Sequence, residues 1–205
     1  MAQIIDAIET SSSSESPSLN DAYLFPTSFA QQRLWFLDQF EPGSPFYNIP
    51  LAVRLQGRLD IDVLRRVLVE IVRRHEILRT TFIALDGQPM QLVTPFEASG
   101  ADPLPLPVTD LSHLPDDQRE AEMYRLATWE AQRPFDLRAG PLVRAALLRL
   151  TDDDQLALLT LHHIIADGWS MGVLLHELAT LYAAFVAGRP APLPDLPIQY
   201  ADYAV

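Results

Sequence analysis

The sequence lacks two residue types on which many active sites depend. None of its 205 residues is cysteine, which excludes a disulfide, a thiolate nucleophile and any metal site built on sulfur. Its 15 basic residues are all arginine, so lysine Schiff-base chemistry is excluded as well. The chain also lacks an uninterrupted run of about 18 apolar residues. We therefore expect no membrane-spanning helix.

Positive charge is also scarce. The chain has 27 acidic residues against those 15 arginines, which gives a formal net charge of −12. Nucleic acid and anionic membrane surfaces are disfavoured as partners, because both repel an acidic chain. The N-terminus has neither the basic residues nor the long apolar core of a secretory signal. By default, we expect a cytoplasmic protein.

The hydrophobic pattern predicts alternating strands and helices from Pro26 onward. Ser28 and Gln31 have the spacing of a capping box, and Asp60 is a suitable N-cap. Asp86-Gly87 is typical of a hairpin turn. The alternation predicts an α/β (α+β) sandwich. The expected strands are 47–59, 80–85, 88–93, 142–150 and 155–163, and the expected helices are 28–40, 60–75, 115–133 and 170–188, with Ser170 as the last N-cap.

Composition divides the chain into three parts. Residues 1–20 are rich in serine, which predicts a flexible leader. Residues 21–189 carry the globular pattern. Residues 190–205 contain four closely spaced prolines, so we expect a proline-rich linker there.

Two adjacent histidines stand where a buried strand gives way to a helix. Successive side chains of a strand point to opposite faces, so His163 shares a face with Leu161 while His162 shares one with Thr160. Only one imidazole can therefore face a given cavity. Since no third histidine or cysteine stands at ligand spacing, we expect no metal site.

Two interpretations of these histidines remain open from the residues alone. Both can be core histidines whose nitrogens are satisfied by backbone hydrogen bonds. Alternatively, His163 can work in a site in which Asp167 offers a partner charge and Gly168 permits close approach of a backbone. Catalytic groups favour such strand-to-helix junctions, because a rigid element holds the side chain beside an open loop.

Four segments, in order, resemble the motifs of condensation domains of nonribosomal peptide synthetases, within the chloramphenicol-acetyltransferase-like superfamily. The most specific is His162-His163-x3-Asp167-Gly168-Trp169-Ser170, and the others are 28–37, 74–82 and 200–205. The resemblance implies a lobe of that fold, with a mixed, largely antiparallel sheet and flanking helices. Complete condensation domains have two such lobes and a site in the tunnel between them. Residues 21–189 are thus expected to form the N-terminal lobe, and 190–205 a linker toward a missing C-terminal lobe.

The resemblance also implies a reaction, which is the formation of an amide bond. The amine of an aminoacyl thioester on a downstream carrier protein attacks an acyl or peptidyl thioester on an upstream one. Both substrates arrive on phosphopantetheine arms, so we expect no cofactor bound directly to this chain. The expected partners are the two carrier proteins, the missing lobe and adjacent synthetase domains, in the biosynthesis of an antibiotic or siderophore. Alone, this half-domain is expected to be inactive or weakly active.

The resemblance assigns roles to individual residues. His163 is the expected general base, or a hydrogen-bonding group that positions the attacking amine. His162 is expected to be a structural neighbour. Asp167 is expected to pair with Arg79, although a carboxylate at this spacing can also hold the imidazole directly. Gly168 is expected to leave clearance for the pantetheine arm.

Several related functions are weighed against this one. The opening motif and the Asp-Gly-Trp-Ser sequence resemble the class that joins two L-configured residues, and an epimerisation domain is the alternative within the fold. Heterocyclisation domains carry an aspartate in place of the two histidines, which argues against that activity. A free-standing acyl-CoA acyltransferase would fit the fold but not all four motifs. A non-catalytic docking module for carrier proteins would need an arginine patch, for which the candidates are Arg65, Arg66, Arg73 and Arg74.

Overall fold

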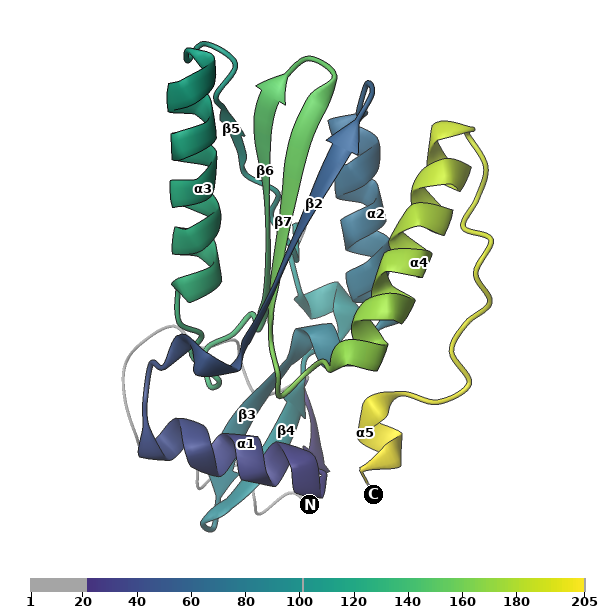
Figure 1. Ribbon diagram of the computed structural model, residues 1–205. Helices are drawn as coiled ribbons and strands as arrows, with labels where there is room; N and C mark the ends of the chain where they lie inside the picture. The colour runs from purple at the N-terminus through teal and green to yellow at the C-terminus, as the bar shows by residue number, and fades with distance from the viewer. Residues whose placement is uncertain (1–21, 101, 205) are drawn as a thin grey trace.

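The computed structural model describes residues 22–100 and 102–204 and contains two sheets (Figure 1). The larger sheet has the strand order β2-β7-β6-β5, and only its edge strand β5 runs parallel to its neighbour. The smaller sheet, β1-β4-β3, is antiparallel throughout. The predicted mixed, largely antiparallel architecture is confirmed. The strands are β1 (Tyr23–Pro26), β2 (Asn48–Gln56), β3 (Thr80–Leu85), β4 (Gln88–Val93), β5 (Val108–Asp110), β6 (Val143–Thr151) and β7 (Asp154–His162).

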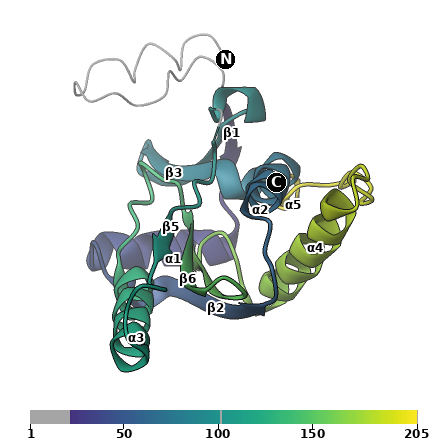
Figure 2. The same cartoon turned by 90° about the horizontal axis from the view of Figure 1, so that it is seen from above.

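Helices cover both faces of the larger sheet, as the two views together show (Figures 1 and 2). One face packs against α3 (Asp116–Gln132), and the other packs against α2 (Ile61–Arg74) and α4 (Gly168–Val186). Strand alternation explains the division, because Leu147 joins the core under α2 and α4 while its neighbour Leu148 packs under α3. The result is a three-layer sandwich in which the end of β7 leads directly into α4.

Local sequence signals account for most element boundaries. Ser28 and Gln31 form the predicted capping box at the start of α1 (Phe29–Phe40). Asp60 caps α2 by accepting a hydrogen bond from the backbone N–H of Val63 at 3.0 Å. Asp86 and Gly87 both have positive φ, 51° and 77°, which is the geometry of a two-residue hairpin turn between β3 and β4.

Three features differ from the predictions. Asp167, not Ser170, is the N-cap of α4, so this helix begins at Gly168. Strands β1 and β5 have four and three residues, too short to show a period in the sequence. The same is true of the short 3₁₀ helices η2 (Pro45–Tyr47), η3 (Glu76–Arg79) and η4 (Phe96–Ala98).

The fourth helix also corrects the expectation about membranes. By length and composition alone, α4 is long and apolar enough to cross a membrane. Of the 18-residue stretch of α4 that meets this criterion, 22 % is buried inside the protein. A count of uninterrupted apolar runs overlooks this helix, because single polar residues such as Glu177 interrupt it. One such helix is only weak evidence for a membrane span, since core helices of water-soluble proteins pass the same test.

The chain ends with a segment that packs on the lobe. No helix or strand occurs from 187 to 199, and a short helix, α5 (Tyr200–Tyr203), follows beside the start of α1 (Figure 1). The expected leader at 1–20 lies outside the described residues. The division of the chain at 21–189 and 190–205 stays a prediction.

Candidate functional site

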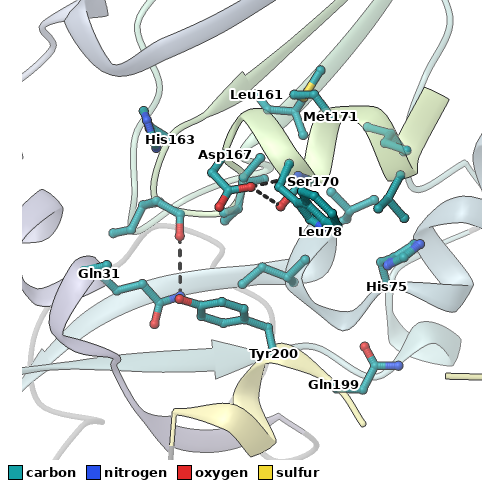
Figure 3. Close-up of a pocket in the computed structure, with 18 of the residues that line it drawn as sticks. Gln31, His75, Leu78, Leu161, His163, Asp167, Ser170, Met171, Gln199 and Tyr200 are labelled. Carbon is teal, nitrogen blue, oxygen red and sulfur yellow. Dashed lines mark hydrogen bonds between the residues drawn. The ribbon is translucent and has the colours of Figure 1, made fainter. Parts of the chain in front are cut away.

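A cavity of about 390 Å³ opens at the turn between β7 and α4 (Figure 3). Its walls come from α1, the end of α2 with η3, the turn itself, the first two turns of α4 and the C-terminal segment. Most lining side chains are apolar. The polar and aromatic side chains that line it include Gln31, His75, His163, Asp167, Trp169 and Tyr200.

His163 lies at the edge of this cavity and is exposed. Its backbone N–H donates to the carbonyl of Tyr47 at 2.8 Å, which extends the pairing of β7 with β2 by one residue. The cavity is lined by Leu161 and His163 but not by His162. The two imidazoles therefore face opposite sides, as the strand alternation predicts, and His163 is the one that faces the open space.

His162 points to the other face and is 2 % exposed. Its Nδ1 accepts a hydrogen bond from the backbone N–H of Ile164 at 3.1 Å, so the ring is neutral with its proton on Nε2. The rings of Tyr47 and Phe135 pack beside it. Burial, and to a lesser extent the charge of His163, lowers the pKa of His162 to about 4. This imidazole is a fixed part of the core.

Asp167 serves the helix rather than an arginine. Its Oδ1 accepts hydrogen bonds from the backbone N–H of Ser170 at 2.8 Å and from the Ser170 hydroxyl at 2.7 Å. These two hydrogen bonds, and then the nearby charge of His163, hold the pKa of Asp167 below its usual range. A carboxylate at a helix N-terminus is also favoured by the helix dipole.

The expected pair between Asp167 and Arg79 is not formed. Arg79 instead donates to the carbonyls of Val72 at 3.2 Å and Thr94 at 2.5 Å, and its Nη2 lies 3.8 Å from Glu76. The physical reason is that these carbonyls lie next to η3, at the end of α2 and just after β4, where they need donors. Burial lowers the pKa of Arg79.

Gly168 is the first residue of α4, and a Cβ placed on it would meet no atom within 4 Å apart from its chain neighbours and the backbone of its own helix. Open space therefore lies beside its backbone. The expected clearance for a pantetheine arm stays a prediction.

A buried ion cluster next to the cavity was missed from the sequence. Arg74 Nε lies 3.1 Å from one carboxylate oxygen of Glu177, and His75 Nε2 lies 2.6 Å from the other. Burial alone would raise the pKa of Glu177, but the hydrogen bonds from His75 and Arg74 outweigh it and lower that pKa overall. Both Arg74 and Glu177 stand in regular helical patterns, and no local signal tells a buried charge there from a solvated one.

This cluster bears on the arginine patch considered for docking. Arg74 is 8 % exposed and therefore unavailable to a partner. Arg65 pairs with Asp62, and Arg73 pairs with Glu70. Arg66 lies over the ring of Phe185 at 5.0 Å from its centroid. The four arginines do not form one free cationic surface.

The C-terminal segment closes one side of the cavity. The side chain of Gln199 accepts a hydrogen bond from the N–H of Glu76 at 3.1 Å and donates to the carbonyl of Arg74 at 3.0 Å. The hydroxyls of Tyr200 and Ser28 lie 2.9 Å apart. Four segments that are far apart in the sequence thus meet around one cavity: 28–37, 74–82, 162–170 and 200–204.

The arrangement can support acid–base chemistry on an apolar substrate. The imidazole of His163 is accessible from an apolar cavity, where it can accept a proton or a hydrogen bond from a nucleophile. Within 22–100 and 102–204, no group of three or more histidine, aspartate or glutamate side chains is arranged to hold a metal ion.

Comparison with known proteins gives consistent matches. The profile of a family described as "Condensation domain" matches residues 22–205. The chain is 50 % identical over 189 residues to a linear gramicidin synthase of Brevibacillus parabrevis, covering 92 % of this chain and 4 % of that protein. It is 50 % identical over 179 residues to phosphinothricin tripeptide synthetase PhsC of Streptomyces viridochromogenes, covering 87 % of this chain and 16 % of that protein.

Solved structures agree with these sequence matches. The starter condensation domain of rhizomide synthetase RzmA superposes with a TM-score of 0.76 at 26 % identity, over 89 % of this chain and 42 % of that one. The first condensation domain of the calcium-dependent antibiotic synthetase, in complex with a substrate analogue, gives 0.75 at 28 % identity, over 85 % and 40 %. The chain therefore spans less than half of either structure and a small part of the synthetases.

Proposed function

The chain belongs to the condensation-domain family of nonribosomal peptide synthetases, and we propose that it forms the N-terminal lobe of a domain that makes an amide bond between two carrier-bound thioesters. The donor is an acyl or peptidyl thioester on an upstream carrier protein. The acceptor is an aminoacyl thioester on a downstream one. Both arrive on phosphopantetheine arms, and the chain itself binds no further cofactor.

The observation that carries this proposal is the difference in environment between two adjacent histidines. His163 lines the cavity and is exposed, whereas His162 is held in the core by its hydrogen bond to Ile164. An imidazole in the position of His163 accepts a hydrogen bond from the acceptor amine, orients it toward the thioester carbonyl and takes its proton as the new C–N bond forms. The carbonyl oxygen becomes an oxyanion. When the carbonyl re-forms, the C–S bond breaks, and the pantetheine thiolate leaves with the proton that His163 took from the amine.

The chemistry asks little more of the protein than positioning. A free α-amine has a pKa of roughly 8, so a useful fraction is already neutral near neutral pH. Bringing the two thioesters together supplies much of the acceleration. General base catalysis by His163 adds about 10²–10⁴-fold where it operates. The open space beside Gly168 accommodates the narrow arm that delivers a thioester.

We propose further that a second lobe covers the mouth of this cavity. Large apolar side chains on the helices that line the cavity are exposed, among them Phe29 at 90 %, Trp169 at 85 % and Tyr203 at 74 %. Exposed apolar surface of this kind marks an interaction site. Alone, the lobe lacks one wall of the tunnel and is inactive or weakly active.

The setting of the reaction is also a proposal. Carrier proteins and adjacent synthetase domains are its partners. The relatives named above are peptide synthetases, which supports a small peptide as the final product, and we propose one of antibiotic or siderophore type. We propose that the reaction takes place in the cytoplasm and that neither nucleic acid nor a membrane takes part in it.

A single-turnover assay read by mass spectrometry tests the function. One carrier is loaded with an acyl thioester and the other with an aminoacyl thioester. The chain is tested alone and joined to the second lobe that complete condensation domains carry. We expect amide product only from the two-lobe form. Inverted stereochemistry of the aminoacyl group without an amide would indicate epimerisation, and carrier binding without product over a range of substrates would indicate a docking module.

A further inference from the structure

The residue that follows His163 is held from two sides by side chains. Its backbone N–H donates to Nδ1 of His162 at 3.1 Å, and its carbonyl accepts from Nε2 of Gln31 at 3.4 Å. The residue is Ile164, which is 3 % exposed, so its backbone groups need partners within the protein. One of the two partners belongs to β7. The other, Gln31, comes from the first turn of α1, far away in the sequence.

The amide of Gln31 has one possible orientation. Its Nε2 also donates to Oε1 of Gln91 in β4 at 3.1 Å, and its Oε1 accepts from the N–H of Ser28 at 3.0 Å. Gln91 in turn donates from Nε2 to the carbonyl of Pro26 at 2.8 Å. Reversing either amide would set acceptor against acceptor. Hydrogen bonds thus connect the carbonyl of Pro26 in β1, through the side chains of Gln91 and Gln31, to the carbonyl of Ile164 in the turn beside His163.

Burial makes this arrangement rigid and costly to disturb. Gln31 is 1 % exposed and Gln91 is 0 % exposed. A buried amide that loses its partner cannot recover the loss from water, so each of the two holds the other in place. Glutamine side chains are mostly exposed in folded proteins, so the burial of these two is unusual.

We propose that Gln31 is a positioning residue for His163, acting through the carbonyl of Ile164 and oriented by Gln91. This rests on the proposed function of His163. Gln31 lines the same cavity, but its polar atoms are committed to the protein, so its contribution is to fix the backbone from which the imidazole projects. Displacement of a reacting group by about 1 Å can cost about 10²-fold in rate.

The test replaces Gln31 by an apolar side chain of equal length in the two-lobe form. Gln31→Met should lower kcat about 10- to 100-fold while KM for the acceptor thioester changes less than about threefold. Gln32→Met is the matched control, because Gln32 is the next residue of α1, is exposed, and donates only to the carbonyl of Thr27. It should leave kcat within about twofold of the unmodified protein.

A double variant separates positioning from stability. In Gln31→Met/Gln91→Met no buried amide is left without its partner, so thermal stability should recover relative to the sum of the single variants. The kcat should stay low, because the carbonyl of Ile164 still lacks its donor. A double variant that recovers both stability and kcat overturns the proposal. If Gln31→Met does not fold, the double variant gives the same reading, because it also removes the donor to the carbonyl of Ile164.

A second readout needs no turnover. In the chain labelled at histidine, the ring resonances of His163 should shift or broaden in Gln31→Met and in the double variant, and stay unchanged in Gln32→Met. Unchanged His163 resonances in folded Gln31 variants overturn the proposal, whatever the assay gives. Absence of amide product from the unmodified two-lobe form would instead refute the proposed function, while these resonances still decide whether Gln31 places the imidazole.

Discussion

Each side of the β7–α4 turn carries a histidine, but the two imidazoles differ in burial and in surroundings. On the inner side His162 is 2 % exposed, accepts a hydrogen bond from Ile164, and has a pKa lowered to about 4. On the outer side His163 is exposed and lines a cavity of about 390 Å³. Two chemically identical side chains, one residue apart, thus serve different purposes.

The comparison shows how the end of a strand can place one histidine in the core and the next in an open cavity. Alternation sends the two imidazoles to opposite faces, so one can be fixed in the core without restricting the other. The fixed ring holds the N–H of the residue after the open one, and Asp167 caps the helix that follows. The position of His163 is thereby fixed by neighbours whose polar groups are hydrogen-bonded within the protein.

The largest effect that would break this contrast is the loss of the inner ring. His162→Ala removes the acceptor for the buried N–H of Ile164 and leaves a cavity beside Phe135. We expect a loss of about 3–5 kcal/mol in the free energy of unfolding, measured by urea denaturation. His163→Ala should change it by less than about 0.5 kcal/mol. Equal losses for the two variants would contradict the assignment.

The burial of His162 should make the free energy of unfolding fall between pH 6.5 and pH 4. The pKa of His162 is about 4 in the folded chain and 6.5 without the fold, so the unfolded chain binds more protons between these values. The stabilising effect of the neutral ring is complete above pH 6.5 and is lost as pH falls toward 4, by about 3 kcal/mol in all.

The contribution of His162 can be isolated from that of the carboxylates. The free energy of unfolding is measured against pH for the unmodified chain and for His162→Asn, whose Oδ1 can accept from Ile164 without titrating. The difference between the two curves should narrow as pH falls from 6.5 to 4. A difference that stays constant over this window would show that His162 does not titrate with a lowered pKa.

The smallest effect concerns the helix cap. Asp167→Ala removes two hydrogen bonds from Ser170 and should cost about 1 kcal/mol, as the loss of an N-cap typically does. A buried ion pair with Arg79 would instead cost about 3–5 kcal/mol. Thermal denaturation of Asp167→Ala beside Arg79→Gln, with the double variant, distinguishes the two. If the stability losses of the two single variants add up in the double variant, Asp167 acts as a helix cap. Strong coupling between the two losses would show instead that Asp167 and Arg79 form an ion pair.

Much of this site can be predicted from the sequence, because its signals are local. The strand alternation places His162 and His163 on opposite faces, the spacing of Ser28 and Gln31 gives the cap of α1, and Asp86-Gly87 gives the hairpin. Each of these depends on residues close together in the chain. The family motifs add the expectation that His163 is the imidazole of the site.

The remainder depends on contacts that local signals do not encode. Arg74 ends α2 and Arg79 follows it closely, and only tertiary packing decides that Arg74 meets Glu177 while Arg79 meets backbone carbonyls. Gln31 looks like a capping residue from its spacing alone. Its second role becomes visible only when β4 and the β7–α4 turn are placed beside α1.

The division of roles between the two histidines is tested most directly by exchanging each for asparagine in the two-lobe form and measuring single-turnover amide formation. Asparagine keeps an acceptor for the N–H of Ile164 but has no group that titrates near neutral pH. We expect His162→Asn to retain turnover within about tenfold and His163→Asn to lose about 10²-fold or more, with both variants folded. Turnover that survives in His163→Asn and disappears in folded His162→Asn would contradict the account.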